Sequence, residues 1–102
     1  MKYYISGAMS GIPEHNYPAF FRAEEQLYKL GYETINPARL GFVKGWEWVD
    51  YMKRDIISMM DADGLVLLKG WENSKGVNLE VDIALRLEMK VVTWEDLLKE
   101  NK

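Results

Sequence analysis

The sequence predicts an α/β protein: one Rossmann-like (flavodoxin-like) domain with a mostly parallel sheet of four to five strands and flanking helices. Short apolar runs alternate with amphipathic stretches along the chain, which is the pattern of strands connected by helices. The 102 residues fit a single domain, residues 1–102, without a repeat or linker. About half of them (48%) are hydrophobic, so disorder is not expected.

The first strand is expected at residues 2–6, and the small, flexible loop 7–13 follows it. A helix is then predicted to begin near Asn16, a suitable N-cap, with Pro18 in its first turn, and to end at Gly31. One face of this helix is apolar, with Phe20, Ala23, Leu27 and Leu30.

The same alternation continues to the end of the chain. It predicts strands at 32–35, 65–68 and 90–93 and helices at 46–60 and 76–87. The apolar face of the 46–60 helix is expected to hold Val49, Met52, Ile56, Met59 and Met60. Thr93 and Asp96 resemble a capping box for a short last helix.

Ligands bind at the carboxyl ends of the strands in sheets of this kind. The loops 7–16, 36–45 and 69–75 are expected at that edge, so the chemistry is sought there and in the first helical turns that follow.

Composition excludes several classes of function. The net charge of −3 gives no basic surface for nucleic acid. The absence of cysteine and the presence of only one histidine, His15, argue against a metal site, and no cofactor is expected. No apolar run reaches membrane-spanning length and no secretory leader is visible, so no membrane partner and a cytoplasmic location are expected.

Glu80 is the carboxylate that is out of place. With a step of about 100° per residue, it falls inside the apolar arc formed by Gly76, Val77, Ile83, Ala84 and Leu87. Asp82 and Arg86 fall on the opposite side. A carboxylate facing the sheet is costly unless it is paired or used. The alternatives are an ion pair, a hydrogen bond to the helix's own first turn, or chemistry.

The loop before this helix could bind an anion. Ser74 offers a hydroxyl, and Gly76 lies among the exposed N–H groups of a helix N-terminus. The alternative is an ordinary helix entry with Ser74 as N-cap.

Several other residues are also considered as candidates for a site. Asp55 lies at the edge of its helix's apolar arc and is either a boundary residue or a second acidic group in a cleft. His15 is read as a surface residue of its loop. The aromatic residues are read as core or interface, with one or two available to stack on a base: Tyr17, Phe20, Trp46, Trp48 and Trp71.

These segments together resemble the nucleoside 2-deoxyribosyltransferase superfamily. The resemblance is carried by Tyr4-Ile5-Ser6-Gly7-Ala8-Met9-Ser10-Gly11, Asn36-Pro37, Lys53-Arg54-Asp55-Ile56 and Ser74-Lys75-Gly76-Val77-Asn78-Leu79-Glu80. Within the superfamily, the chain is similar over roughly residues 2–93 to the short phage and bacterial domains grouped as DUF4406, whose function is unknown.

The resemblance implies a mechanism. Glu80 would attack the anomeric carbon as the base departs, and water or a second base would resolve the glycosyl ester. Asp55 would contact the base or sugar and help to protonate the leaving group. The substrate-binding residues implied by the family, or expected from the loops above, are Ser6, Gly7, Met9, Asn36, Ser74 and Gly76.

Ser74 shifts the expected substrate from nucleosides to nucleotides. Superfamily transferases that act on free nucleosides carry an acidic residue at this place, whereas the nucleoside 5′-monophosphate N-glycosidases carry serine. A hydroxyl beside helix N–H groups attracts phosphate, and a carboxylate repels it.

Three hypotheses follow. The first is a nucleoside 5′-monophosphate N-glycosidase, with deoxyribosyl transfer as a variant activity. The second is a non-catalytic nucleotide-binding module, and the third is an interaction subunit rich in Trp and Met. Leu79 and Leu85 lie outside the sheet-facing arc, and small superfamily members commonly form oligomers, so a homodimer or higher homo-oligomer is expected.

Overall fold

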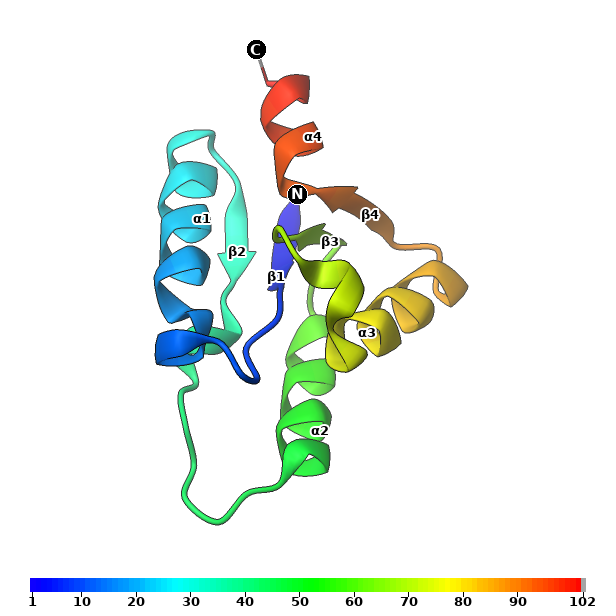
Figure 1. Ribbon diagram of the computed structural model, residues 1–102. Helices are drawn as coiled ribbons and strands as arrows, with labels where there is room; N and C mark the ends of the chain where they lie inside the picture. The colour runs from blue at the N-terminus through cyan, green and yellow to red at the C-terminus, as the bar shows by residue number, and fades with distance from the viewer. Residues whose placement is uncertain (102) are drawn as a thin grey trace.

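A computed structural model of the chain describes residues 1–101. Its strands are β1 (Lys2–Ser6), β2 (Glu33–Ile35), β3 (Gly64–Leu67) and β4 (Lys90–Thr93). They form one sheet in the order β2-β1-β3-β4, and all three strand pairs are parallel (Figure 1). The predicted fold class is confirmed, with four strands, and the strand order is that of the flavodoxin-like arrangement.

Four α-helices flank this sheet: α1 (Tyr17–Lys29), α2 (Trp48–Met59), α3 (Lys75–Arg86) and α4 (Trp94–Glu100). Three single 3₁₀ turns precede α1, α2 and α3 in the chain: η1 (Pro13–Asn16), η2 (Pro37–Arg39) and η3 (Trp71–Asn73). The observed elements agree with the predicted ones to within two residues at each end. Thr93 caps α4, because its Oγ1 accepts a hydrogen bond from the Asp96 N–H at 3.1 Å, but the reciprocal contact of the Asp96 side chain that would complete a capping box is not among the contacts of the described residues. Within residues 1–101, no helix has the length and apolar character needed to cross a membrane.

The two faces of the sheet carry different helices. On one face, α1 and α4 pack against alternate strand residues such as Tyr3 and Ile5. On the other face, α2 and α3 lie side by side and pack against Tyr4 and its neighbours (Figure 1). Because side chains alternate along a strand, Ser6 shares the second face with Tyr4.

Four residues predicted on the apolar faces of helices are exposed instead. Val49 and Met60 of the α2 region are 50% and 45% exposed, whereas Asp55 is buried, so it is no boundary residue. The inward face of α2 is rotated because that helix packs on α3 as well as on the sheet. Leu30 and Leu87 are 38% and 56% exposed, since each follows the last residue of its helix, where contact with the sheet has ended.

The loop after β1 enters α1 through an unusual turn. Glu14, His15 and Asn16 have φ values of 57°, 55° and 61°, in the left-handed region that non-glycine residues seldom adopt. Asn16 stands at the predicted N-cap position, but its side chain does not cap α1. Its Nδ2 instead donates to the carbonyl oxygen of Ala8 at 2.9 Å, which ties the loop to itself.

Candidate active site

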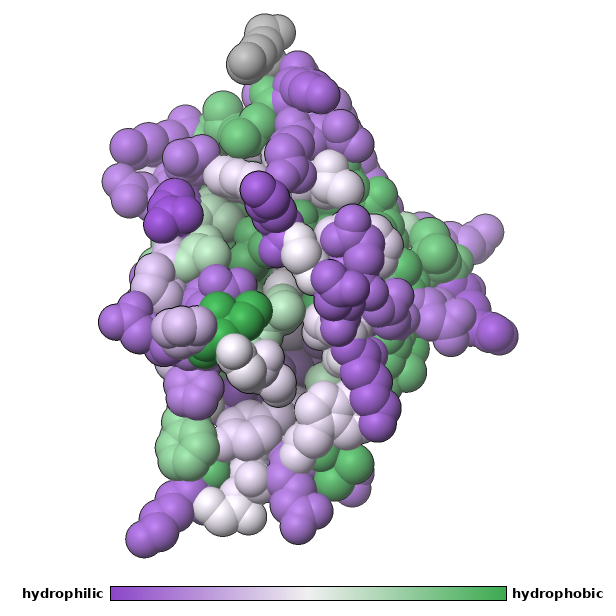
Figure 2. Space-filling view, viewed as in Figure 1, coloured by the Kyte–Doolittle hydropathy of each residue, from purple (hydrophilic) through white to green (hydrophobic). Residues whose placement is uncertain are grey.

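A cavity of about 410 Å³ lies at the carboxyl end of β1, between the loop after β1, α2 and the start of α3. The space-filling view shows pale and apolar residues at the centre of this face, with hydrophilic residues around them (Figure 2). Six of the eight predicted site residues line this cavity: Gly7, Met9, Asp55, Ser74, Gly76 and Glu80.

The other two predicted residues lie beside the cavity. Ser6 is buried behind Glu80 and donates a hydrogen bond to it. Asn36 is also buried, and its Oδ1 accepts a hydrogen bond from the Ala38 N–H at 3.0 Å, which caps η2. The Asn36 Nδ2 has no hydrogen-bond partner among the described residues. The structure therefore joins Ser6 to Glu80 and gives Asn36 a local role in the η2 turn.

Glu80 faces the sheet, as its wheel position predicts, and is only 5% exposed. Its Oε2 accepts a hydrogen bond from Tyr4 Oη at 2.9 Å, and its Oε1 accepts one from Ser6 Oγ at 2.7 Å. Among the described residues it forms no ion pair, and its partners come from β1 rather than from the first turn of α3. Glu80 therefore has neither the ion pair nor the hydrogen bond to its own first helical turn that were considered as alternatives. The hydroxyl groups of two β1 residues fix the orientation of its carboxylate.

Burial raises the pKa of Glu80 to about 7. The hydrogen bonds from Ser6 and Tyr4 act in the opposite direction, and the nearby charge of Asp55 adds to the increase. Burial, followed by the charge of Glu80, raises the pKa of Tyr4 far above its ordinary value. Tyr4 therefore remains a hydrogen-bond donor, and Glu80 changes its charge near neutral pH.

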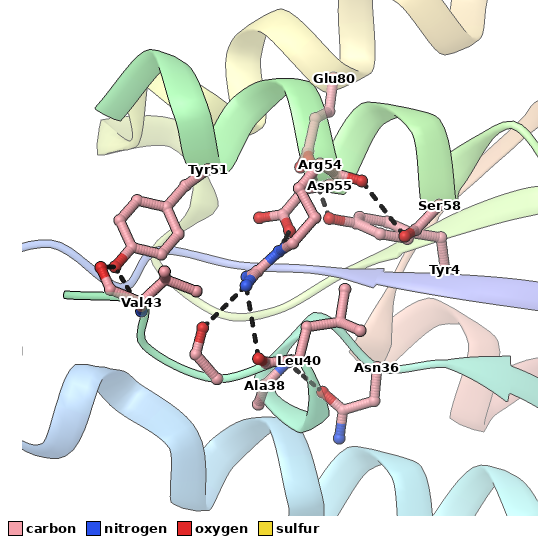
Figure 3. A network of polar contacts seen from close by, with 11 residues as sticks. Tyr4, Asn36, Ala38, Leu40, Val43, Tyr51, Arg54, Asp55, Ser58 and Glu80 are labelled. Atoms are coloured by element: carbon pink, nitrogen blue, oxygen red, sulfur yellow. Dashed lines mark hydrogen bonds and ion pairs between the residues drawn. The ribbon is translucent and has the colours of Figure 1, made fainter. Parts of the chain in front are cut away.

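Asp55 supplies a second buried carboxylate from α2. Its Oδ1 pairs with Arg54 Nε at 3.1 Å, as the close-up shows (Figure 3). Burial raises the pKa of Asp55, and the Arg54 guanidinium opposes that increase. The cavity thus contains two carboxyl groups in unlike settings, one held by neutral hydroxyls and one by a cation.

Tyr4 is a functional candidate that the sequence analysis missed, because it was read only as part of an apolar strand. The signal was present in the spacing. Tyr4 and Ser6 are two residues apart on β1, so both face the same side of the sheet. Glu80 lies on the inward arc of a helix, and the two hydroxyls are natural partners for it once that helix is assigned to this face.

The start of α3 serves as a helix cap and as cavity wall. Ser74 Oγ accepts a hydrogen bond from the Val77 N–H at 3.2 Å, so the ordinary N-cap role exists. Its hydroxyl hydrogen is still able to bond with a ligand. A Cβ on Gly76 would stand 3.0 Å from Met52 Sδ, so glycine permits the close approach of α3 to α2. Lys75 Nζ lies 4.3 Å from the ring centroid of Trp48, at the same end of α3.

Two residues of the loop after β1 shape the other side. A Cβ on Gly7 would stand 2.8 Å from Leu68 Cδ1, so only glycine fits there without displacing a core residue. His15 is exposed, as expected for a loop residue, but it also lines the cavity. Its ring is nearly parallel to that of Phe42, with an angle of 16° and a centroid distance of 6.1 Å.

The described residues include no cluster of three His, Cys, Asp or Glu side chains placed to hold a metal ion. The polar groups that line the cavity include the carboxyl groups of Asp55 and Glu80 and the hydroxyl of Ser74, and aromatic rings form part of its wall.

Comparisons with known proteins agree with this architecture. The family model described as "Domain of unknown function (DUF4406)" matches residues 1–93. The structure is similar to that of a 2-deoxyribosyltransferase from the psychrotolerant bacterium Bacillus psychrosaccharolyticus, with a TM-score of 0.68 and 20% sequence identity. That match covers 91% of this chain and 71% of the transferase chain. A search of curated proteins found no match. The chain therefore belongs to the DUF4406 family and has the nucleoside 2-deoxyribosyltransferase-like fold.

Proposed function

We propose that the protein cleaves the bond between base and sugar in a nucleoside 5′-monophosphate, with Glu80 as nucleophile. The observation that carries the proposal is a buried carboxylate at the wall of a cavity of about 410 Å³, with each oxygen oriented by a hydroxyl of β1. A nucleophile benefits from such fixed orientation, because less freedom is lost on the way to the transition state.

The reaction would proceed by two displacements. A Glu80 oxygen forms a bond to the anomeric carbon while the bond from that carbon to the base nitrogen breaks, and the bonding electron pair leaves with the base. The Asp55 carboxyl group donates its proton to the departing base nitrogen. Water then attacks the anomeric carbon of the glycosyl ester: its proton goes to Asp55, its hydroxyl stays on the released sugar phosphate, and the Glu80 carboxylate is restored. Transfer to a second base instead of water would give the deoxyribosyltransferase activity.

The ionisation of Glu80 sets a condition for this mechanism. With a pKa of about 7, the carboxyl group is largely protonated in mildly acidic solution and is then no nucleophile. Base release should therefore increase as the pH rises through about 7. The rate of base release should also decrease strongly in a Glu80→Asp variant. The shorter side chain would draw the carboxylate oxygens away from the hydroxyls of Tyr4 and Ser6.

Ser74, Lys75 and the N–H groups at the start of α3 would hold the 5′-phosphate. Ser74 lines the cavity, and Lys75 places a cation beside Trp48 at its edge. A helix N-terminus and a hydroxyl suit an anion. Soaking crystals with a nucleoside monophosphate should give phosphoryl density at Ser74, and phosphoryl density elsewhere would contradict this assignment.

A second candidate is a nucleotide-binding module without catalysis. It is favoured by the Tyr4–Glu80–Ser6 hydrogen bonds, which link β1 to α3 and would stabilise the fold even without any reaction. In that case the cavity would bind a nucleotide and leave its glycosidic bond intact.

Self-association is part of the proposal. Leu79 and Leu85 on α3 are 37% and 60% exposed, and Ile57 on α2 is 74% exposed. Apolar side chains on the outer surface of α2 and α3 would be covered in a symmetric dimer. Light scattering should give a dimer mass at roughly tens of micromolar, and Leu85→Lys should reduce it toward the monomer. A wild-type monomer at that concentration would disprove the dimer.

The decisive experiment is incubation with a panel of nucleoside and deoxynucleoside monophosphates, with free base measured by chromatography. Wild type should release base from at least one of them, and Glu80→Gln should release none while still binding it. Asp82→Asn is the matched control, because Asp82 is an exposed carboxylate on the same helix, paired with Arg86. Tight binding without base release by the wild type would establish the second candidate.

A further inference from the structure

Arg54 makes three polar contacts with two parts of the cavity wall. Its Nε lies 3.1 Å from Asp55 Oδ1, within α2. Its Nη1 donates to the carbonyl oxygens of Gly41 at 2.9 Å and Leu40 at 3.4 Å, in the loop before α2 (Figure 3). One planar group therefore joins an acidic residue of the candidate site to a segment more than ten residues away in the chain.

The loop at residues 40–47 contains no helix or strand and depends on α2 for its position. Tyr51 Oη accepts a hydrogen bond from the Val43 N–H and donates one to the Val43 carbonyl oxygen, both at 2.9 Å. The Arg54 guanidinium carbon lies 5.3 Å from the ring centroids of both Trp46 and Tyr51. Tyr51 and Arg54 are three residues apart, so they lie on one face of α2.

This loop is part of the cavity. Gly41 and Phe42 line it together with Tyr51 and Arg54. Phe42 reaches across to the loop after β1, where its ring is nearly parallel to that of His15. The position of the loop therefore determines the distance between Phe42 and His15, which both line the cavity.

Asp55 is held on one side only. Arg54 contacts its Oδ1, while Oδ2 accepts no hydrogen bond from any residue in the described part of the chain. Because Asp55 lines the cavity, the contact with Arg54 leaves one oxygen available to a ligand.

We propose that Arg54 is a positioning residue that couples the loop at residues 40–47 to the orientation of Asp55. The inference rests on the proposed function in assigning Asp55 to substrate. Arginine is required because its planar fork donates in several fixed directions at once, whereas a lysine ammonium is a single point charge. A ligand that engages Asp55 will therefore also change how firmly Arg54 holds the loop.

Four variants test the coupling. Arg54→Gln removes the charge, Arg54→Lys keeps the charge without the fork, and Tyr51→Phe removes only the loop contacts at Val43. Arg86→Gln is the matched control, because Arg86 pairs with an exposed carboxylate outside the site. Two readouts are needed that do not depend on turnover: the NMR titration of the Asp55 carboxyl carbon, and hydrogen exchange at the Val43 N–H.

The proposal predicts a distinct result for each variant. Arg54→Gln should raise the Asp55 titration midpoint and speed Val43 exchange about tenfold, the scale of one lost hydrogen bond. Arg54→Lys should keep the Asp55 titration midpoint close to that of wild type, because the positive charge remains. The Val43 N–H should nevertheless exchange faster than in wild type. Tyr51→Phe should speed the exchange and shift the Asp55 titration midpoint by much less than Arg54→Gln does. Arg86→Gln should change neither.

Two outcomes would overturn the coupling. The first is an Arg54→Gln or Arg54→Lys protein that keeps both the wild-type titration and the wild-type exchange rate. The second is a shift of the Asp55 titration in Tyr51→Phe as large as that in Arg54→Gln, which would indicate general loosening rather than coupling. If Arg54→Gln does not fold, Arg54→Lys carries the test alone. Because neither readout involves base release, failure here is distinguishable from failure of the N-glycosidase proposal, in which the panel assay shows no base.

Discussion

The two faces of the sheet bury different kinds of side chains, although the same strands supply both. On the side of α1 and α4, the core is made of apolar and aromatic residues such as Ile5 and Leu27, with no buried carboxylate among the described residues. On the side of α2 and α3, Tyr4, Ser6, Asp55 and Glu80 are buried together with the apolar core. Adjacent residues of β1 therefore face a dry core in one direction and an acidic centre in the other.

The comparison shows where the protein accepts a cost in stability. A buried carboxylate with a raised pKa resists ionisation, and ionising it weakens the folded state. The face of α1 and α4 carries no such cost. The buried acidic side chains of the candidate site therefore lie on one side of the sheet, and each prediction below tests whether the two sides are separable.

The largest effect is expected from Glu80→Gln. If the acidic face performs the proposed chemistry, base release should decrease by several orders of magnitude, because a covalent nucleophile has been removed. Nucleotide binding, measured by calorimetry, should remain, since the phosphate site uses other groups. Unchanged base release in this variant would show that Glu80 is not the nucleophile.

Leu27→Ala tests the opposite face. Leu27 is fully buried against the α1 and α4 side of the sheet. The truncation should lower the free energy of unfolding by about 2–5 kcal/mol, as measured by urea denaturation. The Glu80 titration should stay as it is in wild type. A large change in that titration would show that the two faces are not separable.

The pH dependence of the free energy of unfolding should depend on the buried carboxylate Glu80, on the side of α2 and α3. Glu80 has a pKa of about 7 in the folded protein and 4.5 as its ordinary value. The folded state therefore binds the proton more tightly, and the stability that this provides is present below pH 4.5 and is lost as the pH rises through 7. Relative to Glu80→Gln, wild type should lose about 3 kcal/mol across that range. Parallel stability curves for the two proteins would contradict the raised pKa.

The smallest effect is expected from a pair of tyrosine variants. Tyr4→Phe removes a hydrogen bond to Glu80 and should raise its titration midpoint further, by about 1 kcal/mol or less than one pH unit. Tyr3→Phe makes the same chemical change at the adjacent residue on the other face and should leave the midpoint unchanged. Carboxyl NMR titrations of both proteins would measure the difference. Equal shifts of the Glu80 midpoint in the two variants would show that the shift does not come from the hydrogen bond between Tyr4 and Glu80.

Much of the fold could be read from the order of residues alone. Strand–helix alternation predicted the parallel sheet, and glycine, proline and capping residues placed the element ends to within two residues. The inward position of Glu80 followed from helix periodicity, because Val77 and Ala84 mark the face that must be buried. These features depend on neighbours within one or two turns, and the sequence contains that information directly.

The partners of Glu80, the burial of Asp55 and the role of Arg54 depended on tertiary structure. Which strand α3 covers, and how α2 is rotated against α3, are set by packing between segments far apart in the chain, such as Gly76 against Met52. Periodicity assigns a residue to a face but not to a partner. The sequence by itself therefore determined the elements and the unusual carboxylate. Only the tertiary structure decided that Tyr4 and Ser6 hold it and that Arg54 joins Asp55 to the loop, because those contacts span 74 and 76 residues in the first case and 13 in the second.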